Sequence, residues 1–248
     1  METNFNSTTA SAEEIARFTA MADAWWDPEG KFKPLHQINP VRIGYIRNLI
    51  CQQYDRDPEG NKPLEKIKLL DIGCGGGLLC EPMRRLGATV TGIDAGKKNI
   101  AVASLHAEQS GLKIDYINQL PEDLTKTKDT FDVVLNMEVV EHVDNVDAFL
   151  KASVALVKPG GIMVLSTINR TMKSLVLAKI GAEYILRWLP IGTHDWRKFV
   201  KPSELVNGLR PYNVDVTDIT GMVYNPFKDK WSLSNDLSVN YLVSSIKN

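Results

Sequence analysis

The chain has 248 residues, a formal net charge of −1 and 3 cysteines. Positive and negative residues are mixed without a basic tract, which argues against a nucleic-acid partner. The cysteines lack C-x-x-C spacing, which argues against a disulfide framework or a structural zinc site. No apolar stretch approaches the ~20 residues of a membrane span, and the N-terminus lacks the features of a secretory signal, so we expect a cytoplasmic protein.

Residues 11–50 are expected to form helices ahead of the sheet. Ser11 and Glu14 have the spacing of a capping box, after which apolar residues recur at helical intervals. Residues 25–36 contain prolines and a glycine and are expected to be irregular, and helical periodicity resumes at residues 39–50. This extension either packs against the core or forms a lid, and both interpretations stay open.

The centre of the chain is a glycine-rich turn after a short apolar strand at residues 69–72. The turn reads G-C-G-G-G at residues 73–77, and a helix follows it. A second strand, residues 88–94, ends in Asp94, where a carboxylate can accept both hydrogen bonds of a ribose diol. The turn and the acid together predict a nucleoside cofactor. A nicotinamide cofactor is less supported, because Leu78 stands where the third glycine of the dinucleotide fingerprint is needed.

Strands and helices alternate through the rest of the cofactor region. Alternation of this kind predicts a parallel, doubly wound sheet, in which ligands bind beyond the C-terminal strand ends. Residues 158–161, K-P-G-G, are expected to be a turn before the fifth strand. The other expected elements are strands at 113–117, 130–137 and 162–167, and helices at 78–86, 98–110 and 147–157.

Directly after the fourth strand, Glu138, Glu141 and His142 stand at positions i, i+3 and i+4. On a helical turn they share one face, where two carboxylates and an imidazole can ligate magnesium, manganese, zinc or cobalt. The alternative is a helix start whose acids complement the helix dipole, with His142 as an isolated base. We favour a functional site because the trio falls at the ligand end of the sheet.

The stretch from Lys173 to Leu189 has a wide apolar face and a narrow polar stripe of Lys179, Glu183 and Arg187. A buried helix and a helix lying in a membrane interface both fit this pattern.

Taken together, these segments resemble the class I S-adenosylmethionine-dependent methyltransferases, and among them the ubiquinone-biosynthesis O-methyltransferase family. The glycine turn and K-P-G-G are shared by many methyltransferases, whereas W-W-D, F-K-P-L-H and G-A-E-Y-I-L are much more specific. The segments that carry the resemblance are residues 25–27, 32–36, 39–42, 71–77, 141–142, 157–161, 181–186 and 192–195.

The resemblance implies an α/β fold with a doubly wound, mostly parallel, seven-stranded sheet of Rossmann-like type, in one methyltransferase domain over residues 1–248. Residues 11–50 would be an N-terminal helical extension or lid, and residues 64–170 the cofactor-binding core. Residues 171–200 would be an amphipathic helical insertion after strand five, and residues 201–248 the C-terminal strands that complete the sheet.

The resemblance also implies site residues. Those expected to bind S-adenosylmethionine are Arg42, Asp71, Gly73, Gly75, Asp94 and Met137. Glu138, Glu141 and His142 are expected to bind a divalent cation, magnesium or zinc, and Glu141 and His142 to be catalytic. A metal bound by adjacent ring oxygens would favour the phenolate, but His142 could instead be a general base, and the sequence leaves both roles open.

The expected substrates are a polyprenyl catechol and a demethylubiquinol. Because each buried methylene of a prenyl tail contributes about 0.8 kcal/mol to membrane partitioning, we expect peripheral attachment to anionic lipid at the inner face of the membrane through residues 173–189. Other ubiquinone-biosynthesis proteins are further expected partners. A non-enzymatic, lipid-associated scaffold is the rival interpretation, and single-turnover methyl transfer distinguishes it.

Overall fold

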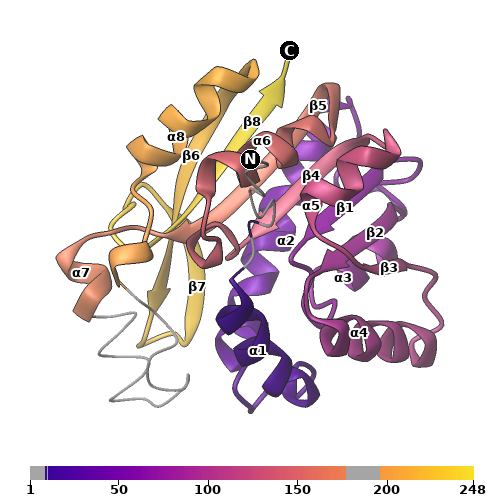
Figure 1. The fold of residues 1–248 in the computed structure, drawn as a ribbon, viewed down its shortest axis with the longest axis horizontal. Helices are drawn as coiled ribbons and strands as arrows, with labels where there is room; N and C mark the ends of the chain where they lie inside the picture. The colour runs from indigo at the N-terminus through magenta and orange to yellow at the C-terminus, as the bar shows by residue number, and fades with distance from the viewer. Residues whose placement is uncertain (1–8, 10, 177–195) are drawn as a thin grey trace, which may run out of the picture.

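The computed structural model describes residues 9, 11–176 and 196–248, and a twisted sheet runs through its centre with helices on both faces (Figure 1). The strands follow the order β3-β2-β1-β4-β5-β8-β6-β7. Their bounds are β1 (Lys68–Ile72), β2 (Thr89–Asp94), β3 (Asp115–Asn118), β4 (Phe131–Met137), β5 (Val157–Ile168), β6 (Val214–Asn225), β7 (Lys230–Ser234) and β8 (Asn240–Lys247).

The sheet is parallel from β3 to β5 and antiparallel from β5 to β7. The α/β class and the doubly wound arrangement are confirmed, but the described residues form eight strands where seven were expected. The additional strand is β7, the second arm of a hairpin with β6. The Asn225 side chain accepts the backbone N–H groups of Phe227 (3.0 Å) and Lys228 (3.2 Å), which turns the chain back on itself.

Most helices among the described residues begin close to the capping or proline residues in the sequence, such as Ser11 before α1 and Pro202 in α8. The expected start of the second helix was wrong, because α2 begins at Lys33 rather than at residue 39. Pro34 lies in its first turn, where the missing N–H of proline removes no helical hydrogen bond, and Pro40 lies inside the helix. The helices are α1 (Ala12–Ala20), α2 (Lys33–Gln53), α3 (Cys80–Arg85), α4 (Lys97–Gln109), α5 (Pro121–Leu124), α6 (Val146–Ala155), α7 (Met172–Ser174) and α8 (Pro202–Leu209), with 3-10 turns η1 (Ala22–Ala24), η2 (Thr125–Thr127), η3 (Val140–His142), η5 (Trp196–Lys198) and η6 (Arg210–Tyr212).

Each face of the sheet buries its own apolar cluster, which explains why the central strands are mostly apolar. Leu69 and Val133 pack with Ile46 of α2, whereas their neighbours Leu70 and Val134 pack on the opposite face with residues of α6 and α8. Burial on both faces fixes the register of the strands, and therefore the positions of the loops at their C-terminal ends.

Two further expectations can be compared with the structure, and a third falls mostly outside the residues that it describes. K-P-G-G is not a turn before strand five but a bulge inside β5, because Phe131 pairs with Val157 while Val133 pairs with Ile162. Of the amphipathic stretch from Lys173 to Leu189, residues 177–189 lie outside the described residues. Among the helices that the structure does describe, none is long and apolar enough to cross a bilayer.

Candidate active site

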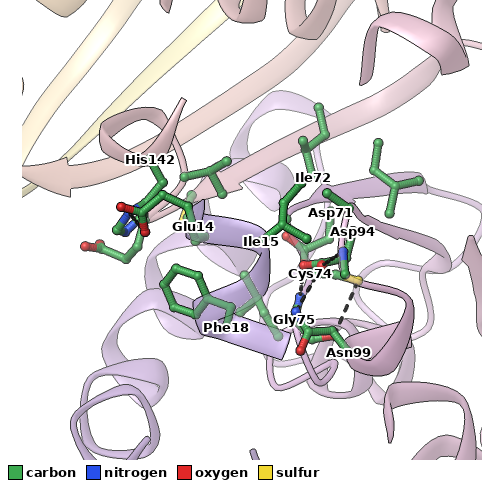
Figure 2. A pocket seen from close by; sticks show the side chains of 18 of the residues that line it. Glu14, Ile15, Phe18, Asp71, Ile72, Cys74, Gly75, Asp94, Asn99 and His142 are labelled. Carbon is green, nitrogen blue, oxygen red and sulfur yellow. Dashed lines mark hydrogen bonds and ion pairs between the residues drawn. The ribbon is translucent and has the colours of Figure 1, made fainter. Parts of the chain in front are cut away.

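One cavity lies beyond the C-terminal ends of β1, β2 and β4, and residues of α1 and α2 also line it. Figure 2 shows its two sides: Asp94, Gly75 and Asn99 gather on one, and Glu14 and His142 face each other on the other. We call these the cofactor half (Asp71, Gly73, Gly75, Asp94 and Asn99) and the acceptor half (Glu14, Arg42, Glu138, Glu141 and His142).

In the cofactor half, Asp94 ends β2 and stands beside the glycine turn, as its position in the sequence predicts. Its Oδ2 accepts the N–H of Gly75 (3.0 Å), and its Oδ1 accepts the N–H of Gly96 (2.7 Å) and the amide of Asn99 (3.0 Å). A carboxylate offers about four acceptor positions, so one remains for a ligand hydroxyl. Burial raises the pKa of Asp94, against the lowering effect of these three donors.

The glycine turn presents bare backbone to the cavity. Gly73, Gly75 and Gly77 have φ angles of 72°, 53° and 87°, which side-chain-bearing residues rarely adopt. A Cβ at Gly75 would lie 2.5 Å from the Trp25 ring, and one at Gly73 would lie 2.5 Å from Val139. The turn therefore requires glycine for its conformation and for the close approach of its neighbours, while the N–H groups of Gly73, Gly75 and Gly77 already donate within the protein, to Ile93, Asp94 and Cys74.

The sequence analysis did not identify Asn99 as a site residue. Its side chain links Trp25 of the N-terminal extension to Asp94, the carboxylate expected to bind the ribose. The indole N–H of Trp25 donates to Asn99 Oδ1 (3.1 Å), and Asn99 in turn donates to Asp94. Trp25 also stacks on Phe32, with ring centroids 3.7 Å apart. The signal available in the sequence was the position of Asn99 in the first turn of the helix that follows Asp94.

Asp71 lies at the base of the cofactor half, on β1. It is 3 % exposed and accepts a hydrogen bond from the Cys80 thiol at 3.2 Å. Burial raises the pKa of its carboxyl to about 7, with a smaller contribution from the nearby charge of Asp94. The main role of Asp71 in this structure is therefore structural: as a buried acid it links β1 to α3 through its hydrogen bond with Cys80.

In the acceptor half, the buried Arg42 forms an ion pair with the partly exposed Glu138. Arg42 is not a solvated charge: it is 3 % exposed, and its Nη2 donates to Glu138 and to Ser166 Oγ (3.2 Å). Glu138 also accepts the Ser166 hydroxyl, and its own N–H donates to the Ser166 carbonyl (2.9 Å). The Nε of Arg42 is buried and has no hydrogen-bond partner among the described residues, as expected for a donor that binds an anionic ligand.

The expected helical face of Glu138, Glu141 and His142 does not form. Glu138 has a φ of 57°, and only the 3-10 turn η3 follows it, so the i, i+3, i+4 argument was wrong about the geometry. Glu141 turns inward, where it is 4 % exposed and accepts the Thr167 hydroxyl at 2.8 Å. Burial raises the pKa of Glu141 well above its usual range, and the neighbouring charge of Glu138 adds to the effect.

His142 faces the N-terminal helix. Its Nδ1 lies 3.2 Å from Oε2 of Glu14, and Phe18 packs edge-on against the ring at a centroid distance of 5.1 Å. Ser11 caps α1 as expected, but the Glu14 carboxylate points to His142 instead of closing a capping box. The close contact with His142 lowers the pKa of the Glu14 carboxyl, against the opposing effect of burial.

The two expected ligands fit this cavity differently. For S-adenosylmethionine, the glycine turn, the open position on Asp94 and the unpaired Nε of Arg42 provide complementary groups, and Met137 also lines the cavity. For a divalent cation, no three acidic, histidine or cysteine side chains in the described part of the chain converge on one point. Glu138, Glu141 and His142 each bind a different protein partner, so this arrangement does not fit a metal.

Comparison with known proteins supports a methyltransferase domain and its fold. A family model for a methyltransferase domain matches residues 44–218. Among solved structures, a possible histamine N-methyltransferase from Thermotoga maritima superposes with a TM-score of 0.66 at 13 % identity, covering 95 % of this chain and 99 % of that one. Magnesium protoporphyrin IX methyltransferase from Synechocystis with bound S-adenosylmethionine superposes with a TM-score of 0.61 at 16 % identity, over 97 % of this chain and 100 % of that one.

Curated relatives are much more similar in sequence. The ubiquinone biosynthesis O-methyltransferase of Brucella ovis is 55 % identical over 236 residues, covering 95 % of each chain. The protein of the same name from Cereibacter sphaeroides is 56 % identical over 242 residues, covering 97 % of this chain and 98 % of its own.

Proposed function

This chain belongs to the ubiquinone biosynthesis O-methyltransferase family and is an S-adenosylmethionine-dependent O-methyltransferase; we propose that it methylates ring hydroxyls of polyprenylated catechol and demethylubiquinol intermediates of ubiquinone synthesis. The observation that carries this proposal is the single cavity that joins the cofactor half to a histidine. When bound, S-adenosylmethionine supplies an electrophilic sulfonium methyl group. The protein must supply an oxygen nucleophile aligned with it.

For that nucleophile we propose His142 as the general base. A phenol has a pKa near 10, so little phenolate is present at neutral pH, and a base within hydrogen-bonding reach contributes typically 10²- to 10⁴-fold. His142 is the one histidine that lines the cavity among the described residues, and Ile15, Phe18 and Val143 supply apolar contacts for a ring. Glu141, expected to be catalytic, is bound to Thr167, and we propose that it supports the loop of His142.

The rival role of His142 is metal ligation together with Glu138 and Glu141. Because these side chains do not converge, we derive no step through a cation. The test is the rate after treatment with a chelator and after return of magnesium or zinc. An unchanged rate supports the base, whereas loss on chelation and recovery with the cation would replace the base with the metal site.

Radiolabelled S-adenosylmethionine and a catechol with a short prenyl tail test the function itself under single-turnover conditions. The proposal requires direct binding of S-adenosylmethionine and one labelled methyl ether per site. Binding of a nicotinamide dinucleotide in its place, or binding without transfer, would contradict it.

For the long-tailed substrates we propose attachment to the inner face of the membrane. What supports this is the apolar pattern from Lys173 to Leu189 and the partitioning of the prenyl tail. Flotation with anionic liposomes should be stronger for the wild type than for the double variant Leu177→Glu/Leu186→Glu, and it should weaken with salt. Equal flotation of folded wild type and variant would exclude this role.

A further inference from the structure

Residues 11–32, which we call the strap, form one wall of the cavity. Ile15 and Phe18 of α1 line it, and so does Trp25, which directly follows η1. The same cavity contains Asp94 of the cofactor half. A cofactor bound at Asp94 therefore lies against the strap as well as against the sheet.

The strap is attached to the rest of the protein by few buried side chains. No residue of α1 is buried. The strap has an apolar cluster of its own, separate from the clusters on the two faces of the sheet, whose buried members are Met21, Ala22, Trp25, Phe32 and Leu78. Of these, Leu78 alone lies outside the strap. A segment with so few buried contacts opens more readily than the sheet on which it lies.

Two adjacent tryptophans hold the end of the strap on the glycine turn. Trp25 packs so closely on the turn that a Cβ at Gly76 would overlap its side chain, and its indole N–H donates to Asn99. The indole N–H of Trp26 donates to the carbonyl of Gly76 (2.9 Å). The Trp26 ring also stacks on the imidazole of His106, with ring centroids 3.4 Å apart and an angle of 5° between the planes. Both tryptophans thus contact the turn that carries the cofactor half.

His106 is itself held in place by the core. It lies on α4, and its Nδ1 is 2.6 Å from Oε1 of Glu81 on α3. Glu81 is 2 % exposed, and its Oε2 lies 3.5 Å from Arg85. Trp26 therefore rests on a ring that two helices fix in position. Neither Trp26 nor His106 is among the residues that line the cavity, so their contact can be removed without changing a group that touches the cofactor.

We propose that Trp26 is a latch of the strap: its place between Gly76 and His106 keeps the strap closed over the bound cofactor, and release of these two contacts sets the rate at which S-adenosylhomocysteine leaves. When Trp26 leaves the His106 ring, the neighbouring Trp25 loses its support and the glycine turn is uncovered. The latch acts on cofactor exchange and takes no part in methyl transfer. This inference depends on the cofactor alone, whatever the acceptor is.

The test compares Trp26→Ala with Trp26→Phe, and Leu105→Ala is the matched control. Leu105 is 55 % exposed and precedes His106 on α4, so its truncation removes an apolar side chain beside the latch but not from it. A chase of bound radiolabelled S-adenosylhomocysteine with unlabelled compound measures its departure. We expect Trp26→Ala to release it about 10-fold faster than the wild type, and Trp26→Phe, which keeps a ring on His106 but loses the N–H, about 3-fold faster. Leu105→Ala should match the wild type.

Two further measurements separate a latch from a residue that acts in the chemistry or in folding. The single-turnover rate of methyl transfer at saturating S-adenosylmethionine should stay within about threefold of the wild type in all three variants. In hydrogen exchange, S-adenosylhomocysteine should protect residues 11–32 in the wild type and in Trp26→Phe more than in Trp26→Ala. The peptide of β4, residues 131–137, should exchange equally in all of them, which shows that the sheet is intact.

An unchanged departure rate in Trp26→Ala would overturn the latch, and so would an equal acceleration in Leu105→Ala. Departure from Trp26→Phe no faster than from the wild type would also overturn it, and this holds even if Trp26→Ala disturbs the sheet. A large loss of the single-turnover rate at saturation would instead place Trp26 in the chemistry. If the wild type binds S-adenosylmethionine but methylates no phenol, the proposed substrate fails, while the departure rates still report on the latch.

Discussion

The two halves of the cavity differ in how far apart their residues lie in the sequence. The cofactor half is taken from residues 71–99, one strand-turn-helix-strand unit and the start of the next helix. The acceptor half combines Glu14 of α1, Arg42 of α2 and the loop after β4, with Ser166 and Thr167 of β5 as supports. One half is therefore built by a local motif, whereas the other exists only after distant segments have packed together.

This difference separates binding from chemistry. The cofactor half presents a glycine turn without side chains and a carboxylate with one open acceptor position, which can recognise a nucleoside without reacting with it. The acceptor half contains an imidazole, a paired guanidinium and three carboxyl groups, whose properties depend on what covers them. Substitutions in the cofactor half should then change affinity for S-adenosylmethionine, and substitutions in the acceptor half, apart from Arg42 with its unpaired Nε, should change the rate of transfer.

The largest effect is expected in the acceptor half. His142→Asn removes the proposed base and should lower kcat by about 10²- to 10⁴-fold. The affinity for S-adenosylmethionine should stay within about twofold of the wild type, because His142 lies across the cavity from Asp94 (Figure 2). Steady-state rates and calorimetric titration measure the two quantities separately. A parallel loss of affinity would remove the distinction between the halves.

A buried acid in the cofactor half should produce a pH-dependent stability. Because burial holds the pKa of Asp71 at about 7 in the fold, above 3.8 in the unfolded chain, its protonated form stabilises the fold fully below about pH 4. That contribution is lost as the pH rises through about 7. Asp71→Asn should therefore gain about 2 to 4 kcal/mol in unfolding free energy relative to the wild type between pH 4.5 and pH 8.

Urea denaturation without S-adenosylmethionine at several pH values measures this difference. Asp115→Asn, at an exposed position on β3, is the control and should show little pH-dependent difference. A constant offset between Asp71→Asn and wild type would mean that the carboxyl is ionised throughout this pH range.

The same contrast explains what could be predicted from the sequence. Strands buried on both faces and a glycine turn followed by an acid are local patterns, so the sheet, the turn and the position of Asp94 were predictable. Glu14 was interpreted as a capping residue because its contact with His142 joins residues 128 positions apart, a pairing that helical spacing does not contain. The side-chain arrangement of Glu138 was missed for a similar reason: Arg42 and Ser166 compete for its carboxylate, and its positive φ prevents a helix from starting there.

Asp94→Asn should weaken the binding of S-adenosylmethionine by about 1 to 3 kcal/mol, because the amide loses the charge-assisted hydrogen bond to the ribose. It also disturbs the contacts with the N–H groups of Gly75 and Gly96. Isothermal titration calorimetry is the measurement. An affinity equal to that of the wild type would remove Asp94 from the cofactor half.

A smaller effect should follow from Gly75→Ala, for which Gly111→Ala is the matched control. Both glycines have positive φ, but a Cβ at Gly75 would meet Trp25, whereas one at Gly111 meets nothing within 4 Å. The two variants therefore share a backbone strain of about 1 to 2 kcal/mol. Only Gly75→Ala should also weaken S-adenosylmethionine binding, by about tenfold or 1.4 kcal/mol. Equal affinities in the two variants would show that the contact with Trp25 does not shape the cofactor half.

The separation of binding from chemistry is tested most directly by the single-turnover rate of methyl transfer at saturating S-adenosylmethionine, measured for Asp94→Asn and His142→Asn side by side. We expect Asp94→Asn to recover to within a few-fold of the wild-type rate once the cofactor saturates it. We expect His142→Asn to stay about 100-fold or more below the wild type at every cofactor concentration. Recovery of His142→Asn at high S-adenosylmethionine, or a large deficit of Asp94→Asn that persists at saturation, would contradict it.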